Sequence, residues 1–571
     1  MPRTSLGCLF SIAAIAVVAT FMGCSSSANP AGPGPTAQPE EAGAPPEPAD
    51  GGAPDGQADA DVPPPCTGTP TECAVLWEQK ASDRFDAAVK NPAALAAFAK
   101  AVPKGGDLHN HLTGAVYAET YLAWGQADGD CINSTTFSAV FSNQCSASTQ
   151  PVPASGAFFD QIIGAWSMKG FVPGTALADS GHEHFFNTFG KYGAIAGAHR
   201  DDDIADVLKR AADENQVYVE TMFNLGKNVG TLAASTWTAT PSSMTAADLP
   251  AFYDSLIASP TFAAQVNLDA AVVDSAATSY RTILGCAGAS APAACQVGVR
   301  FISQVSRTGA ADTIFGQLVS AYEMAAKTKH IVGVNLSSPE DDVPSLVNYE
   351  LHMAMLDFLY AHYTVPNTSP LHVTLHAGEL APKFLPVGHE TDNTFHIRRA
   401  VEVGHAERIG HGLDILTETE PMALLDDMRT KNVLLEVCLS SNDQILEVSG
   451  VNHPLSEYLK KGVPVALATD DQGVSRSSMA GEFAKAAVDQ KLTYRQLKTM
   501  ARNSLEHAFL PGASVWTSVS DATAVAACAR TATMGLGDQP NATCKPFLDA
   551  SERATMQWEL ERRFLAFESK Q

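Results

Sequence analysis

The sequence predicts an α/β fold, a (β/α)8 barrel with a helical insertion after the first strand and a helical extension at its C-terminus. Short apolar runs alternate with longer segments of helical periodicity, which is typical of parallel strands joined by right-handed crossovers. About eight such runs occur, the number that closes this barrel. A doubly wound open sheet would show the same alternation, but no glycine-rich nucleotide loop follows an early strand. We expect strands at Asp107–His111, Val217–Phe223, Val297–Ser303, Ile331–Leu336, His372–Ala377, Arg408–His411, Val433–Cys438 and Val463–Thr469.

The first residues read as a targeting segment. Arg3 supplies a positive start, Leu6–Met22 is mostly apolar, and Gly23 is followed by Cys24. This pattern resembles a bacterial lipoprotein signal over residues 1–24 and predicts lipidation of Cys24. The protein would then be exported and anchored by lipid on the periplasmic or cell-surface side of a membrane. Ordinary secretion after cleavage at Gly23 is the alternative.

The remaining chain divides by composition into a linker and a large domain. Residues 25–65 are rich in Ala, Pro and Gly and bury too little apolar surface to order, so we expect a disordered tether. Residues 66–571 are expected to form the barrel domain, with an insertion at 112–216. Helical periodicity predicts a helix over Ala81–Val102 ahead of the first strand, and a last helix from Ser551 to about Phe567.

Cysteine spacing and net charge limit the classes of protein that fit. The formal charge of −25 provides no basic excess for phosphate neutralisation, so we expect no nucleic-acid partner and membrane contact only through the lipid. Eight of the 11 cysteines form short-range pairs in stretches that read as loops, which favours disulfides in an exported protein. The pairs are Cys66/Cys73, Cys131/Cys145, Cys286/Cys295 and Cys528/Cys544; Cys438 is left over as a buried core thiol.

Metal-ligating side chains stand at the carboxyl ends of four predicted strands. In a (β/α)8 barrel these ends meet at one face, where active sites lie. The sequence therefore predicts that the side chains share one site. They are His109 and His111 on the first strand, His376 on the fifth, His411 on the sixth, and Asp470 and Asp471 after the eighth.

The residue types favour one Zn2+ per chain. His109 and His111 are two residues apart on a strand, so they face the same side and can share a metal. His376 and Asp470 complete a shell of three imidazoles and one carboxylate. This shell suits zinc, with iron, manganese and cobalt as alternatives.

Three further side chains fit acid–base work around that metal. A bound metal lowers the pKa of a water molecule towards neutrality. We expect His411 and Asp471 to orient this water and shuttle its proton, and Glu379, three residues after His376, to act as a general acid towards the substrate.

Four motifs resemble those of the adenosine deaminase family of metal-dependent amidohydrolases: His109-Asn110-His111-Leu112, His376-Ala377-Gly378-Glu379, Arg408-Ile409-Gly410-His411-Gly412 and Thr469-Asp470-Asp471. Further motifs are similar to its secreted, growth-factor-type branch: Pro103-Lys104-Gly105-Gly106, Phe185–Phe189, Glu436-Val437-Cys438 and His453-Pro454. The resemblance runs from about Pro103 to about Pro511. It implies the same zinc ligands, Glu379 protonating a purine ring nitrogen, and hydrolytic release of ammonia from a 6-aminopurine nucleoside such as adenosine, which gives inosine.

The departures from the family pattern concern expected substrate contacts. The family carries Asp where Thr113 stands, Gly where Ser338 aligns, and Pro where Gln472 follows the two aspartates. Phe185 and Phe186, in the insertion, are expected either to form an apolar lid over the substrate or to be helix core. Two other functions stay open: an amidohydrolase acting on another amine, a cyclic amide or an ester, and a non-catalytic surface binding protein.

Overall fold

The computed structural model describes residues 66–174, 178–225, 227–240, 243–529 and 540–570. All of them belong to one compact unit, Asp61–Gln571. The expected signal segment 1–24, its Cys24, and the tether 25–65 lie outside the described residues. Within the described ranges no single helix is long and apolar enough to cross a bilayer, and one bent pair, Ala246–Ile257 with Pro260–Ile283, meets the criteria of length and composition.

Eight parallel strands form the centre of the fold, in the order β1-β5-β6-β7-β8-β9-β10-β11. A bridge between Asn110 and Asp470 joins the first strand to the segment after the last, so the sheet closes into a barrel. The predicted (β/α)8 fold is confirmed, and the open-sheet alternative is wrong because the two edges meet. The strands are β1 Gly106–His111, β5 Tyr218–Phe223, β6 Gly298–Ser306, β7 Ile331–Ser337, β8 His372–Ala377, β9 Arg408–His411, β10 Leu434–Val437 and β11 Val465–Leu467.

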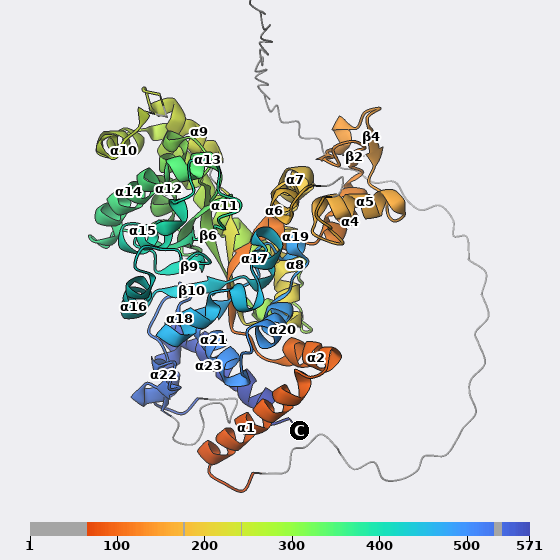
Figure 1. Cartoon of the computed structure of the whole chain (residues 1–571), viewed down its shortest axis with the longest axis vertical. Coiled ribbons are helices and arrows are strands. Elements are labelled where there is room, and N and C mark those ends of the chain that lie inside the picture. Colours follow the sequence, from red (N-terminus) through yellow and green to blue (C-terminus); the bar gives the residue numbers. More distant parts are fainter. Residues whose placement is uncertain (1–65, 175–177, 226, 241–242, 530–539, 571) are drawn as a thin grey trace, which may run out of the picture. The chain divides into compact units, whose positions relative to one another are not determined.

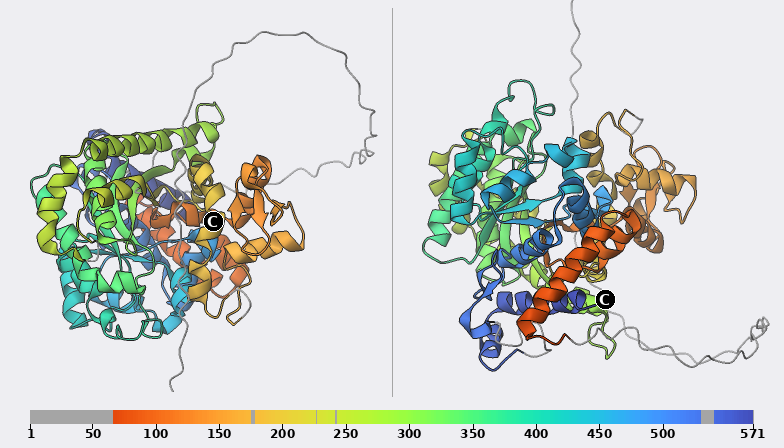
Figure 2. Two further views of the ribbon diagram at one scale, coloured as in Figure 1. Left: turned by 90° about the horizontal axis from the view of Figure 1, so that it is seen from above. Right: turned by 60° about the horizontal axis from the view of Figure 1, so that its bottom comes forward.

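The strands are buried on both faces, as an all-parallel sheet requires. Every residue of β1, β5, β7, β9, β10 and β11 is buried. Helices lie outside the strands, as the view from above shows (Figure 2). They include α12 Ala311–Ala325, α14 Tyr349–Leu359, α16 Pro421–Lys431, α18 Leu455–Lys461, α20 Met479–Asp489 and α21 Tyr494–Glu506.

The insertion between β1 and β5 contains strands as well as helices. It contains a three-stranded antiparallel sheet, which the sequence analysis did not predict, in the order β3-β2-β4. Residues of the insertion, among them Tyr121 and Trp166, form the larger part of a second hydrophobic core. In Figure 1 the small sheet lies with α4 and α5 beside the barrel. The elements are α3 Leu112–Ala115, α4 Ala118–Asp128, β2 Cys131–Asn133, β3 Ala139–Val140, β4 Thr149–Pro151, α5 Ala157–Trp166, α6 Gly181–Phe186, α7 Phe189–Ala198 and α8 Arg200–Asp213.

The predicted helix over Ala81–Val102 is wrong. Two helices occupy this region, α1 Pro70–Ala88 and α2 Pro92–Ala101. Pro92 disfavours helical geometry in the residue before it, and the Asn91 side chain accepts hydrogen bonds from the backbone N–H groups of Ala93 and Ala94, so a new helix begins there.

The C-terminal extension packs against the first helix. The last helix, α23 Glu552–Glu568, is confirmed close to its predicted bounds. Lys498 of α21 forms ion pairs with Glu568 of α23 at 2.6 Å and with Glu78 of α1 at 2.8 Å. The two ends of the described chain are therefore held together across α21, as the right-hand view of Figure 2 shows.

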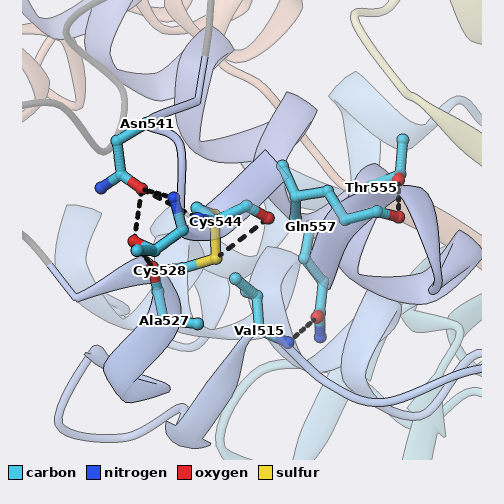
Figure 3. Close-up of a disulfide and its surroundings, with 9 residues drawn as sticks. Val515, Ala527, Cys528, Asn541, Cys544, Thr555 and Gln557 are labelled. Carbon is cyan, nitrogen blue, oxygen red and sulfur yellow. Dashed lines mark hydrogen bonds between the residues drawn. A yellow bond between two sulfur atoms is a disulfide. The ribbon is translucent and has the colours of Figure 1, made fainter. Parts of the chain in front are cut away.

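All four predicted disulfides form, and the described cysteine left free, Cys438, is buried. The prediction that the paired cysteines lie in loops is only partly right, because Cys73 lies in α1 and Cys131 in β2. Cys528–Cys544 links the tail to α22 Cys544–Asp549 (Figure 3). There the Asn541 side chain accepts a hydrogen bond from the Cys544 backbone N–H at 2.8 Å.

Candidate active site and metal centre

The barrel closure itself brings the predicted ligands together. The backbone N–H of Asp470 donates to the carbonyl of His109 at 2.9 Å, and the N–H of His111 donates to the carbonyl of Asp470 at 3.4 Å. His376 is the last residue but one of β8, and its ring reaches the same point. Asp470 has a φ of +57° and His411 a φ of +66°, a backbone region costly for residues with a Cβ and concentrated at functional sites.

Four side chains present ligand atoms to one centre. The Nε2 atoms of His109 and His111 lie 3.1 and 3.3 Å from Nε2 of His376. Asp470 Oδ1 lies 3.3 Å from His111 Nε2 and 3.6 Å from His109 Nε2. Ligands about 2.1 Å from a tetrahedral metal are about 3.4 Å apart, so the spacing of these four atoms fits a first-row divalent ion.

Each of the three imidazoles is held from behind through its other nitrogen. His109 Nδ1 lies 2.8 Å from Glu436 Oε2, His376 Nδ1 lies 2.6 Å from Asn335 Oδ1, and His111 Nδ1 lies 3.4 Å from Gln304 Oε1. An oxygen acceptor at Nδ1 keeps the proton there and leaves the Nε2 lone pair free for a metal. The donor set therefore fits a metal in chemistry as well as in spacing.

The carboxylate ligand is held in the same way. The hydroxyl of Ser441 donates to Asp470 Oδ2 at 2.7 Å. A second possible ligand group, with His411 and Cys438, is less suitable. Burial raises the pKa of the Cys438 thiol well above its usual value, whereas a metal needs the thiolate.

Glu379 is placed and tuned as an acid. It lies beyond β8, and its Oε2 is 3.7 Å from His411 Nε2. The carboxylate of Glu340 fixes this turn by accepting the backbone N–H groups of Gly378 at 3.1 Å and Glu379 at 2.8 Å. Burial, reinforced by the charges of Asp470, Glu340 and Asp341, raises the pKa of the Glu379 carboxyl well above its ordinary value. This shift favours the protonated form.

Two buried polar atoms beside the ligands have no hydrogen-bond partner among the described residues. They are His411 Nε2 and Asp471 Oδ1. Buried polar groups are normally paired, so unpaired ones at a cavity indicate a place for water or substrate. Gly114 makes room for Asp471, because a Cβ at Gly114 would lie 1.6 Å from Asp471 Oδ1.

A cavity of about 730 Å3 opens over His111, His376, Glu379, Asp470 and Asp471, whereas His109 and His411 lie behind its lining. Among its described lining residues are no lysine and no arginine. Phe185 and Phe186 were expected to be either a lid over the substrate or helix core. Phe185 is buried in the insertion's core, and both rings also line the cavity. The lining comprises His111, Thr113, Phe185, Phe186, Phe189, Gly190, Tyr192, Gly193, Ala196, Gly197, Asn224, Leu225, Gln304, Thr308, Ser338, Pro339, Asp342, His376, Glu379, Asp470 and Asp471.

Of the five expected substrate contacts, four line the cavity and one does not. Thr113 and Ser338 reach it, and Ser338 has a φ of +81°, a conformation that favours glycine, which the resembled family carries there. Gln472, which was expected to contact the substrate, does not line the cavity. It is buried away from the cavity, where its amide contacts Arg210 at 3.1 Å and Glu214 at 3.4 Å. It lies there because α19 Gln472–Ser475 begins at this residue and directs its side chain towards α8.

Several residues behind the site were not predicted. Glu436, Asn335, Gln304 and Ser441 hold the ligands, and Glu340 holds the Glu379 turn. One signal was present in the sequence: a lone carboxylate inside the apolar run Leu434–Val437 must be paired when buried. Glu436 is paired with His109 and, at 2.6 Å, with Arg408.

Comparison with known proteins agrees with this site. A family model described as adenosine deaminase matches residues 245–518. The adenosine deaminase of Klebsiella pneumoniae (strain 342) is 32% identical over 216 residues, which are 38% of this chain and 56% of that protein. That of Photorhabdus laumondii subsp. laumondii is 29% identical over 218 residues, with the same two shares. The match thus spans little more than half the length of these curated relatives.

Two solved structures are also similar. The adenine deaminase of Arthrobacter aurescens is 18% identical, with a TM-score of 0.44, over 72% of this chain and 94% of that one. The N6-mAMP deaminase of Arabidopsis has 18% identity and a TM-score of 0.43, over 72% and 95%. The matched segment of the family model contains Glu379 and Asp470, and over this segment the chain is similar to the adenosine deaminase family.

Proposed function

We propose that the protein hydrolyses the amino group from adenosine or a related 6-aminopurine nucleoside, releasing ammonia and the 6-oxo product. The observation that carries the proposal is the position of Glu379: a buried carboxyl with a raised pKa stands beside a group of four metal-ligating atoms at one cavity. An aminopurine needs such an acid, because its ring must gain a proton when water adds to the carbon that bears the amine. Similarity to the adenosine deaminase family supports the same reaction.

The proposed cofactor is one Zn2+ held by His109, His111, His376 and Asp470. When bound, it supplies Lewis acidity that lowers the pKa of a water molecule at the site. The residues of the chain then divide the remaining work. Glu379 donates a proton to the ring nitrogen next to the reacting carbon, and the unpaired polar atoms of His411 and Asp471 hold the attacking water.

The reaction balances with water as its only co-substrate. The water oxygen forms a bond to the carbon that carries the amine, and the ring nitrogen takes the proton of Glu379. The bond from this carbon to the exocyclic nitrogen then breaks, and the amine leaves as ammonia with one of the two protons released by the water. The ring retains the oxygen as a carbonyl, and the second proton of the water restores the carboxyl of Glu379.

The cavity favours a neutral nucleoside over a nucleotide. Its described lining offers no lysine or arginine to pair with a phosphate, and it carries the acidic side chains of Asp342, Glu379, Asp470 and Asp471. Phosphate recognition in proteins commonly relies on the charged side chains of arginine or lysine. Phe185 and Phe186 provide an apolar wall against which a purine ring or the apolar side of a sugar packs.

A substrate screen tests the proposal. Purified protein with zinc supplied is assayed for ammonia release on adenosine, deoxyadenosine, AMP, adenine and N6-methylated adenine compounds, and its metal content is measured on the same sample. We expect release from the nucleosides and little from AMP. The His376→Ala variant is the matched control for contaminating deaminases. A protein that carries zinc but releases no ammonia from any of these compounds would refute the assignment.

For the location of the protein we propose export and lipidation at Cys24, on the grounds of residues 1–24 alone. Changing Cys24 to Ser should release the protein from membranes or block its processing, because lipid attachment needs the thiol. Membrane fractionation and the mass of the mature N-terminus measure this. A variant that fractionates like the wild type would favour ordinary secretion.

A further inference from the structure

A chain of buried hydrogen bonds leads away from the active site behind His411. His411 Nδ1 lies 3.0 Å from the side-chain nitrogen of Asn442, in α17 Leu439–Leu446. The side-chain oxygen of Asn442 lies 3.1 Å from His453 Nε2. The chain ends where the backbone N–H of Leu455 donates to His453 Nδ1 at 3.1 Å.

The last contact fixes the direction of all the others. A backbone N–H can only donate, so His453 Nδ1 accepts and carries no proton. The neutral ring then has its proton on Nε2 and donates it to Asn442. The Asn442 oxygen is thereby the acceptor, and its NH2 group must face His411. His411 Nδ1 consequently accepts as well, and the proton of a neutral His411 ring sits on Nε2, the atom that faces the active site.

The Leu455 N–H is available for this purpose because of where a helix begins. Leu455 is the first residue of α18, and the first N–H groups of a helix have no partner inside it. Pro454 precedes it and has no N–H that could compete. His411, Asn442 and His453 are 0%, 0% and 2% exposed, so solvent does not offer alternative partners.

The ring proton of His411 is thus on the opposite nitrogen from that of the three proposed ligands. His109, His111 and His376 each face an oxygen acceptor through Nδ1, which leaves the Nε2 lone pair for a metal. His411 faces a donor through Nδ1, which leaves an N–H at Nε2. Such an imidazole neither ligates a metal through Nε2 nor takes a proton from water there.

We propose that Asn442 and His453 are positioning residues that hold His411 as the Nε2–H tautomer, so that His411 serves as a hydrogen-bond donor to the attacking oxygen and not as its base. This inference rests on the proposed deaminase reaction. His411 Nε2 has no hydrogen-bond partner among the described residues, and the carboxyl oxygens beside it, Glu379 Oε2 at 3.7 Å and Asp470 Oδ2 at 3.9 Å, are both beyond hydrogen-bond length. An oxygen of water or substrate lying between them would accept it.

The tautomer can be read directly, without an activity assay. Protein labelled with 15N in its histidine rings, with zinc bound, gives long-range 1H–15N correlations that distinguish a protonated ring nitrogen from a bare one. The His411 signals are identified by their loss in His411→Gln. We expect a protonated Nε2 and a bare Nδ1. A protonated Nδ1 in the wild type would overturn the proposal, whatever the substrate proves to be.

A single substitution should reverse the tautomer. Asn442→Asp keeps the shape of the side chain but offers only acceptors, so His411 must donate through Nδ1 and expose a lone pair at Nε2. We expect reversed NMR signals, unchanged zinc content, a KM close to that of the wild type, and a kcat lowered about 10–100-fold, the usual effect of changing a supporting group. Asn503→Asp is the matched control. Asn503 donates to the Val465 carbonyl at the start of β11, far from the carboxyl ends of the strands, and its variant should keep the wild-type tautomer and kcat.

A second pair of variants covers the case in which Asn442→Asp does not fold. His453→Gln retains an N–H donor for Asn442, whereas His453→Leu removes it and frees the amide to turn. We expect the wild-type tautomer and most of the kcat in the first, and a mixed tautomer with a lower kcat in the second. Equal behaviour of the two folded variants would overturn the proposal. If the wild type releases no ammonia but shows the Nε2–H tautomer, the proposed function is wrong, while the positioning role of Asn442 and His453 is still supported.

Discussion

Replacing Glu379 by Gln tests the acid that the proposed reaction depends on. Gln has the same shape and keeps an N–H donor, but it cannot transfer a proton to the purine ring. The Glu379 backbone N–H is held by Glu340, so the turn itself does not depend on the side chain being changed. We therefore expect a folded variant that keeps its zinc and still binds a nucleoside.

The size of the effect follows from the state of this carboxyl. Burial and the neighbouring carboxylates raise the pKa of Glu379, which favours the protonated form that can give its proton to the ring. General acid catalysis contributes about 10²–10⁴-fold, which corresponds to about 3–5 kcal/mol of transition-state stabilisation. Because the interaction develops only in the transition state, the loss should fall on kcat and leave nucleoside binding within about a few-fold.

The assay compares three quantities on one preparation: ammonia release, nucleoside binding and bound zinc. Glu418→Gln is the matched control, since Glu418 is also buried with a pKa raised to about 7, mainly by burial, but lies outside the cavity. Its carboxylate caps the start of α15 His396–Glu402, a role that Gln can retain. Loss of zinc in Glu379→Gln would show that Glu379 is a ligand. Near-wild-type turnover would show that the substrate needs no ring protonation, and the deaminase proposal would fall with it.

Three further predictions concern the proposed metal, the space that Asp471 occupies beside Gly114, and the ion pair between the terminal helices. His376→Ala should lose zinc and activity together while keeping the barrel's circular dichroism. Gly114→Ala should lower kcat by about 10²-fold with zinc retained, because its Cβ must displace Asp471; equal activity would show that Asp471 has no role in the reaction. Burial opposes ionisation of Glu78, but Lys498, with smaller contributions from Arg495 and Arg502, outweighs it, and the Glu78 pKa is lowered to about 2. The stability that this ion pair gives is present above about pH 4.5 and lost towards about pH 2, so urea midpoints of the wild type and Glu78→Gln should converge on acidification.

The sequence predicts the strands and their chemistry well because both leave local signals. A buried parallel strand is a continuous apolar run, and a histidine or aspartate at its end stands out against that run. All eight strands form within a few residues of their predicted bounds, and the six side chains expected at their ends meet at one site. Gln472 could not be placed in this way, because the direction of a side chain after a strand depends on the helix that begins there.

The groups that tune the site leave weaker signals. Asn335 of β7 contacts His376 on the neighbouring strand β8, whereas Gln304 of β6 reaches His111 of β1 past the strand between them. Only the register of the closed barrel decides which residues meet. The contact between Asn442 and His453 depends on the turn that joins two helices, α17 and α18. The sheet within the insertion is made of strands two or three residues long, too short for a periodic pattern to show.

The seam where the barrel closes and the proposed metal centre are one and the same place. Between β1 and the end of β11 the backbone contributes only the bridge at Asn110 and Asp470, whereas other neighbouring strands share longer runs of paired residues. Side chains reinforce the seam: the Thr469 hydroxyl donates to the Asp107 carboxylate, and the Asn110 amide donates to Thr469. Asp470 stands on one side of the seam, and two of its three fellow ligands, on β1, stand on the other. A metal held by these side chains would therefore cross-link the two edges of the sheet, and its binding free energy would contribute to closing the barrel as well as to catalysis. A bound metal would thereby supplement the single backbone bridge that follows the short last strand.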